Sequence, residues 1–350
     1  MTEYNESDTI KTLKITNGKK KMDLFAPIFN QMLVLFSFIL IGFILSRWKL
    51  VPEDSTKTLS KLENYVLVPA LVMGTFITNC TPQTLARVWQ LLLMSIAMAG
   101  VVVPLSIVVS KLCFKEDFLR KIATYGLGFS NFGFMGNAIV KSAFEHIFFE
   151  YTVFTLPFWC LIYAWAVPTL LIPREDGVGA KRSFREKIKP FINPMLIGML
   201  IGMVIGLTGL GKIMPSPITQ VIAVAGDCMS PIAMILTGMT IGKIPLLKLF
   251  KKTRLYIVTA VRLVGYPLLV LGIFALLRLL PDNAFTTNTF FVCGACMASM
   301  PMGLTSIFVP AAYGKDTTDA AGMALISHLF SIITIPLVFA FLQGVIGVVI

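Results

Sequence analysis

Charged residues are scarce in this chain of 350 residues. They account for 14% of the sequence, whereas hydrophobic residues account for 56%. A soluble globule of this length cannot bury so large an apolar fraction in one core. Apolar runs of roughly 20 residues recur, and that length carries an α-helix across a hydrocarbon layer of about 30 Å. The composition therefore predicts an all-α, polytopic membrane protein that is surrounded by the lipid bilayer.

Motifs of enzymes and metal sites are also missing. The chain has only two histidines, and it contains no HExxH, no GxSxG and no pair of intramembrane aspartates. Cys293 and Cys296 have the spacing of a redox or metal pair, but they lie in an apolar run without a second pair or histidine ligands nearby. We therefore predict no enzyme activity, no metal, no disulfide framework and no cofactor.

The net charge of +12 comes from Lys and Arg residues that are divided among short links between the apolar runs. A nucleic-acid partner requires a continuous basic face, which this distribution does not supply. Most positive residues lie in the links after the odd-numbered runs, and cytoplasmic links are enriched in Lys and Arg. We therefore predict a multi-pass protein of the cell membrane with both termini on the extracytoplasmic side and no nucleic-acid partner.

The apolar runs divide the chain into two halves of five spans each. A polar tail occupies residues 1–25, and a polar cytoplasmic linker at 173–189 separates a first repeat, 26–172, from a second repeat, 190–350. An odd number of spans per repeat places the second copy upside down in the membrane. The ten predicted spans are residues 26–46, 62–79, 88–110, 120–142, 150–172, 190–210, 216–241, 254–280, 288–312 and 320–348.

Each repeat carries an interruption in its fourth span. Residues 126–137 (GLGFSNFGFMGN) and 298–305 (ASMPMGLT) place Gly, Asn and Pro inside apolar runs. Non-helical backbone at membrane depth is tolerated only inside protein or beside a water-filled cavity, and half-helix N-termini favour anions. The alternative is a tight glycine contact and a simple proline kink, but repetition in opposed halves favours a binding site. The candidate substrate-binding residues are Asn131, Gly133, Gly136, Asn137, Met300 and Pro301.

The segments 130–136 (SNFGFMG), 298–301 (ASMP) and 312–314 (AYG) resemble those of the auxin efflux carrier family, whose bacterial members include malate permease-like proteins. The resemblance extends from the first span to the tenth. It implies two inverted five-helix repeats, with discontinuous helices 4 and 9 that cross at mid-membrane beside a carboxylate-binding site. It also implies an elevator-like motion of a transport half against a scaffold half. Where the family commonly has proline soon after Gly136, this chain has Asn137 and Ala138, which leaves open whether the first crossover is less sharply broken or its site chemistry differs.

Few ionisable side chains lie within the spans, and each needs a partner or an aqueous contact. Arg262 follows Arg254 by about two helical turns and is a candidate for binding a substrate carboxylate. The alternative is that Arg262 reaches the cytoplasmic headgroups. His328 is a candidate proton relay, although the sequence favours a hydrogen-bonded core histidine.

Two acidic side chains, Glu63 and Asp227, precede prolines at equivalent positions of the two repeats. Carboxylates bind hard cations and titrate when they are desolvated, so both are candidates for a coupling H⁺ or Na⁺. For Glu63 the sequence favours an interfacial position beside Lys61. For Asp227 the alternative is satisfaction by neighbouring helix groups.

Taken together, these features predict a secondary transporter of small organic anions, such as malate or related carboxylates. A membrane-embedded anion sensor or channel is the alternative, because it would share the same cavity. Opposed interruptions in inverted repeats favour alternating access over a continuous pore. The expected partners are a small carboxylate and the lipid bilayer, and the sequence leaves open whether the chain forms a homodimer.

Overall fold

The computed structural model describes residues 25–172, 193–243, 252–277 and 288–345. Regular structure in these ranges is helical. The predicted 173–189 linker and nearly all of the polar tail lie outside the described residues. All six cysteines lie inside them and are free thiols.

Helical segments make up most of the described residues. In chain order they are α2 (Phe25–Arg47), α3 (Ser55–Leu62), η1 (Glu63–Leu67), α4 (Val68–Asn79), α5 (Pro82–Cys113), α6 (Asp117–Gly128), η2 (Phe132–Gly136), α7 (Asn137–Ala143), η3 (Glu145–Ile147), α8 (Phe148–Leu161), η4 (Ile162–Leu171), α10 (Pro194–Thr208), η6 (Leu210–Lys212), α11 (Ser216–Gly242), α13 (Thr253–Ala260), η7 (Val261–Gly265), α14 (Tyr266–Leu277), α15 (Asn288–Ser299), α16 (Thr305–Ala312) and α17 (Thr318–Val345).

Six of the described helices are long and apolar enough to cross a membrane. They are Phe25–Arg47, Pro82–Cys113, Glu145–Leu171, Ser216–Gly242, Thr253–Leu276 and Thr318–Gln343. At the other four predicted spans, the helices begin with polar turns, are shorter, or are interrupted. These spans are residues 62–79, 120–142, 190–210 and 288–312. A multi-pass, all-helical architecture is therefore established, whereas the ten-span inverted repeat stays a prediction.

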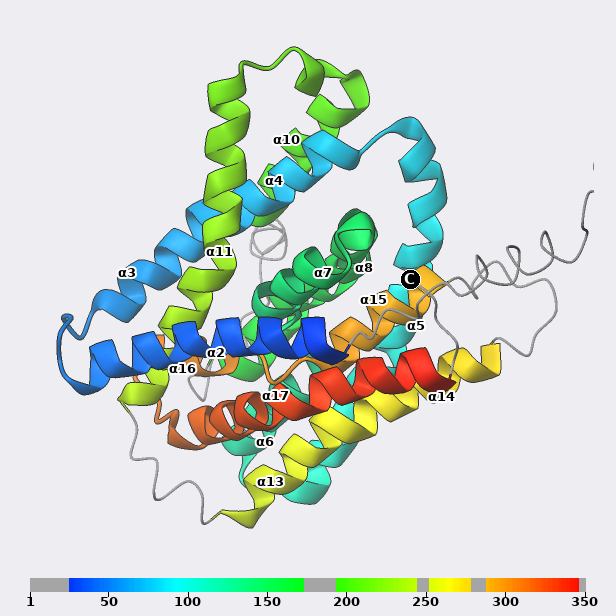
Figure 1. Ribbon diagram of the computed structural model, residues 1–350. Helices are drawn as coiled ribbons and strands as arrows, with labels where there is room; N and C mark the ends of the chain where they lie inside the picture. Colours follow the sequence, from blue (N-terminus) through cyan, green and yellow to red (C-terminus); the bar gives the residue numbers. More distant parts are fainter. Residues whose placement is uncertain (1–24, 173–192, 244–251, 278–287, 346–350) are drawn as a thin grey trace, which may run out of the picture.

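The helices pack into two bundles that differ in how they are held together. The first bundle consists of α2, α3–α4, α10 and α11, and the second of α5, α6, η2–α7, α8, α13–α14, α15, α16 and α17. Figure 1 shows α4, α10 and α11 above and α13, α14 and α17 below, with α7 and α8 between them. Contacts of α2 with α17 and α7, of α4 with α8 and of α11 with η2 join the two bundles.

Glycines bring the helices of the first bundle into backbone contact. On α10, Gly198, Gly202 and Gly206 recur every fourth residue and face α4. A Cβ at Gly202 would lie only 2.5 Å from the carbonyl oxygen of Met73. Because lipid provides no hydrophobic drive for helix association, such close packing of small residues supplies the attraction between membrane helices. The crossing of α2 and α11 is built in the same way, since a Cβ at Gly238 would overlap the backbone of Ile39.

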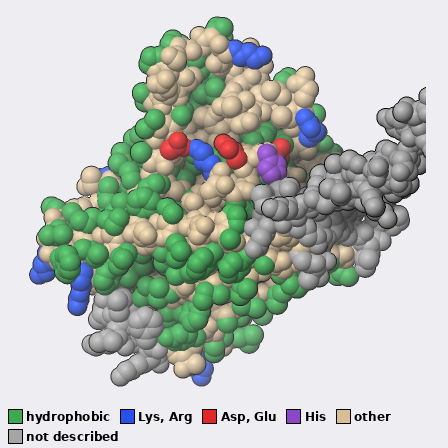
Figure 2. Space-filling view, viewed as in Figure 1, with side chains coloured by type: hydrophobic (Ala, Val, Ile, Leu, Met, Phe, Trp, Pro, Cys, Tyr) green, Lys and Arg blue, Asp and Glu red, His purple; other side chains and the backbone are tan. Residues whose placement is uncertain are grey.

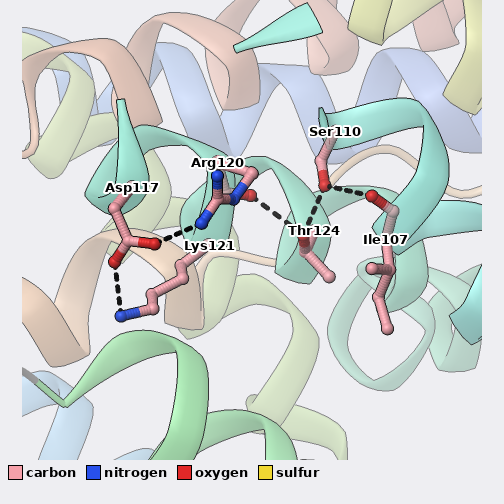
Figure 3. A network of polar contacts seen from close by, with 6 residues as sticks. All are labelled: Ile107, Ser110, Asp117, Arg120, Lys121 and Thr124. Atoms are coloured by element: carbon pink, nitrogen blue, oxygen red, sulfur yellow. Dashed lines mark hydrogen bonds and ion pairs between the residues drawn. The ribbon is translucent and has the colours of Figure 1, made fainter. Parts of the chain in front are cut away.

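In the second bundle, a polar network fixes the start of α6 against α5 (Figure 3). Asp117 forms ion pairs with Arg120 and Lys121 along one face of α6. The Thr124 hydroxyl donates to the carbonyl of Arg120 at 2.9 Å and lies 2.6 Å from the hydroxyl of Ser110 on α5. The start of α6 is thus anchored before the helix is interrupted further along.

Replacement of Gly202 by leucine tests the helix contact in the first bundle. We expect Gly202→Leu to lower the thermal stability of the detergent-solubilised protein clearly, because overpacking a close contact costs about 1–3 kcal/mol. Gly272→Leu on α14 is the matched control, since nothing lies within 4 Å of a Cβ at that exposed position. Equal melting temperatures for the two variants, measured by fluorescence-detected size exclusion after heating, would show that the α4–α10 contact tolerates separation.

Candidate functional site

The two predicted interruptions face each other in the second bundle. The helix α6 ends at Gly128 and α15 ends at Ser299, and the backbones between these helices and their continuations pair as a short antiparallel bridge at Ser130 and Met302. The backbone N–H of Asn131 donates to the carbonyl of Pro301 at 2.7 Å, and the backbone N–H of Gly303 donates to the carbonyl of Phe129 at 3.1 Å. We call residues 129–131 and 300–304 the crossing. Each interruption thus satisfies peptide groups that the other leaves without a helical partner.

Arg262 on η7 closes the crossing from one side. Its Nε donates to the carbonyl of Met300 at 3.0 Å, Nη1 to that of Leu127 at 2.8 Å and Nη2 to that of Met297 at 2.9 Å. These carbonyls belong to the last turns of α6 and α15 or directly follow them, where the helix dipole is negative and a cation is stabilising. The guanidinium carbon also lies 5.4 Å from the ring centroid of Tyr266.

This position changes the interpretation of Arg262. The side chain is only 2% exposed, so the alternative that it reaches the headgroups is wrong. Its fork of donors holds the C-terminal ends of two half-helices, one from each interruption. Arg262 is therefore a structural clamp on the crossing in this conformation, and binding of a substrate carboxylate by Arg262 stays a prediction.

Asn131 and His328 form a second buried link at the crossing. Asn131 is 2% exposed and His328 1% exposed. The His328 Nδ1 lies 2.7 Å from the carbonyl of Ala324. Because a carbonyl only accepts, we assign the proton to Nδ1. Nε2 then accepts a hydrogen bond from the side-chain amide of Asn131 at 3.1 Å. His328 thus has the partners of a hydrogen-bonded core histidine, which is the interpretation that the sequence favours.

The glycines after the first interruption make room for aromatic side chains of α8. A Cβ at Gly133 would lie 2.3 Å from the Trp159 ring, and one at Gly136 would lie 2.1 Å from the Tyr151 hydroxyl. That hydroxyl donates to the carbonyl of Phe132 at 3.0 Å. Met300 and Pro301 are likewise buried. These candidate residues therefore pack the interior of the crossing.

Asn137 occupies a different environment, on the wall of a cavity between the two bundles. This cavity has a volume of about 310 Å³ and lies between α2, α7 and α11. A neighbouring cavity of about 430 Å³ lies between α4, α7, α8 and α11. Figure 2 shows basic, acidic and histidine side chains gathered in the hollow between the α4–α10–α11 region and the body below it. The crossing is thus packed, whereas the space for a ligand lies beside α7.

Lys141 and Asp227 meet across these cavities. The Lys141 ammonium on α7 forms an ion pair with the Asp227 carboxylate on α11, and both residues line both cavities. The partner of Asp227 is therefore Lys141, which lies on α7 across the cleft. Sequence reasoning treated Lys141 as a topology signal. Its position one helical turn after Asn137, on the same helix face, was the signal that it shares the site.

Glu63 lies where the sequence did not favour it. The side chain is 1% exposed, whereas Lys61 is exposed, so the interfacial position beside Lys61 is wrong. Glu63 begins the π-helical turn η1, which packs against α11. Neither carboxylate oxygen has a hydrogen-bond partner among the described residues. The widened turn points the side chain into protein, which spacing alone does not reveal.

Comparison with known protein families gives one match. Residues 27–339 match a family described as membrane transport protein. A comparison with curated proteins gives no match. The family match covers both interruptions, both cavities and all of the candidate site residues.

Replacing Arg262 tests the clamp. We expect Arg262→Gln to lower the melting temperature of the purified protein, because each buried carbonyl that loses its partner costs about 1–3 kcal/mol. Arg254→Gln is the control on the same helix, two turns earlier and exposed, and we expect it to be neutral. A fully stable Arg262→Gln protein with lost ligand binding would instead favour the substrate role.

Proposed function

Because the chain belongs to the membrane transport protein family, to which the auxin efflux carriers belong, we propose that it is a secondary transporter of small organic anions that works by alternating access. The resemblance seen in the sequence is confirmed by this membership. The family is one of membrane transporters, so transport across a membrane stands on the family match. Our proposal concerns the substrate and the mechanism.

The observation that carries the proposal is the pair of interruptions at the crossing. Broken helices in secondary transporters place half-helix N-termini beside the substrate, where free N–H groups and the positive end of the dipole favour anions. Here η2–α7 and α16 begin at the crossing. The first of these leads directly to the cavity lined by Asn137 and Lys141. A small carboxylate fits this combination of amide and ammonium.

The two bundles support an elevator-like mechanism with the second bundle as the moving part. Close backbone contacts make the first bundle rigid. In the described part of the chain, the Lys141–Asp227 ion pair and the hydrogen bond from Ser230 to the carbonyl of Phe134 at 2.9 Å span the boundary. An apolar boundary with few such contacts has little directional bonding to break when one bundle slides. We further propose two inverted five-helix repeats in the plasma membrane, with both termini outside.

Glu63 is the strongest candidate for the coupling ion. A buried carboxylate without a partner is costly in its charged form, so it needs a proton or a metal cation. Asp227 and His328 have partners in this conformation. Glu63 lies on the helix that continues into α4, which lines the larger cavity. We infer that Glu63 gains or loses its ion as the bundles move.

Uptake by purified protein in liposomes tests the transport proposal. With labelled malate and a panel of competing mono- and dicarboxylates, we expect saturable uptake that accelerates under a pH or sodium gradient imposed separately. Counterflow of labelled against unlabelled malate should occur, because a carrier exchanges its substrate. Binding without flux under every gradient would make the protein an anion sensor.

Replacement of Glu63 tests the coupling proposal. We expect Glu63→Gln to remove the response to the gradient while leaving malate exchange intact, because glutamine imitates the neutral carboxyl and holds no ion. Glu53→Gln, which changes an exposed carboxylate before α3, should keep the response. If Glu63→Gln liposomes still accumulate malate under the gradient, the coupling ion binds elsewhere.

A further inference from the structure

Lys141 is placed where a substrate anion would need a cation. It lies in the last turn of α7 and lines both cavities between the bundles. Arg262, the cation at the crossing, already donates to three carbonyls. The Lys141 side chain is 42% exposed, so its ammonium is open to a ligand that enters the cleft.

The two cavities between the bundles differ in the number of acidic side chains that line them, and this difference favours the smaller cavity for an anion. Glu145 and Glu150 line the larger cavity together with Asp227, which makes it unfavourable for an anion. Of the carboxylates described, only Asp227 lines the smaller cavity. Its wall also carries the amide side chains of Asn137 and Gln31. A volume of about 310 Å³ lies at the small end of ligand pockets and suits a small organic acid.

We propose that Lys141 binds the carboxylate of the substrate in the smaller cavity, and that Asp227 holds the Lys141 ammonium in the empty protein. The entering anion takes the place of Asp227, so one carboxylate replaces another on the same ammonium. This inference rests on the proposed function and adds to it the residue that recognises the anion. It also assigns Asp227 as an internal competitor of the substrate.

The exchange of partners is energetically easy. The Asp227 side chain is 58% exposed, and ion pairs exposed to this degree contribute little to stability because solvent screens them. Asn137 lies four residues before Lys141 on α7 and presents its amide on the same helix face. The incoming carboxylate therefore accepts hydrogen bonds from both the Lys141 ammonium and the Asn137 amide.

The exchange also has a mechanical consequence. Lys141 belongs to the α7 segment that continues the crossing, and Asp227 belongs to the first bundle. Loading of the site breaks one of the polar contacts that hold the two bundles in register. Loading therefore removes a weak polar contact across the boundary at which the bundles are proposed to slide.

The two halves of the ion pair should have opposite effects on binding. We expect Lys141→Gln to weaken malate binding at least tenfold, because the ammonium is lost. We expect Asp227→Asn to tighten it by about threefold to fivefold, because the competitor is lost. The double variant should bind as weakly as Lys141→Gln. Binding is measured by isothermal titration of purified protein with malate, and the melting temperature of each variant is recorded to show that it folds.

Lys252→Gln is the matched control. Lys252 is also half exposed and ion-paired, with Asp319, but it lines neither cavity, and its loss should leave malate binding unchanged. If Lys141→Gln and Asp227→Asn both weaken binding to the same degree, the pair is only structural and the inference is overturned. If the wild-type protein transports malate and Lys141→Gln binds it normally, the inference fails alone. If the wild-type protein neither binds nor transports any carboxylate of the panel, the proposed function fails with it.

Discussion

Peptide groups that leave a helix inside a membrane have no water to bond with, and this constraint organises the second bundle. Two helices are interrupted at the same depth, and each supplies the backbone donor and acceptor that the other lacks. The last carbonyls of α6 and α15 remain, and Arg262 takes them with three donors. An intramembrane arginine and two broken helices, each costly alone, become stable together because each satisfies the others.

Full satisfaction at the crossing has a consequence for ligand binding. Asn131 and His328 are buried and share a hydrogen bond, and Arg262 is buried on three carbonyls, so these side chains hold the half-helices in place. The polar side chains that remain accessible lie one to three turns further along α7, on cavities between the bundles. Buried polar residues thus hold the crossing together, whereas Asn137 and Lys141 line the cavity beside it.

The packing of the helices separates what is rigid from what is able to move. Glycine contacts within the first bundle are so close that a single methyl group would overlap a neighbouring carbonyl. Between the bundles the described contacts are mostly apolar, and an ion pair of half-exposed groups adds a weak, reversible contact. The structure thus combines close backbone contacts within the first bundle with a boundary that carries a weak ion pair.

The sequence by itself determined the membrane class and both interruptions, because hydrophobic length and the placement of Gly, Asn and Pro are properties of neighbouring residues. It also identified Arg262 as a costly charge that needs partners. Only the tertiary structure decided what those partners are, since Arg262 and Leu127 are 135 residues apart and Lys141 and Asp227 are 86 apart. The burial of Glu63 and the importance of Lys141 escaped sequence reasoning for the same reason. The cost of a polar group in a membrane can be estimated from local sequence, but the group that offsets it is brought near by the fold.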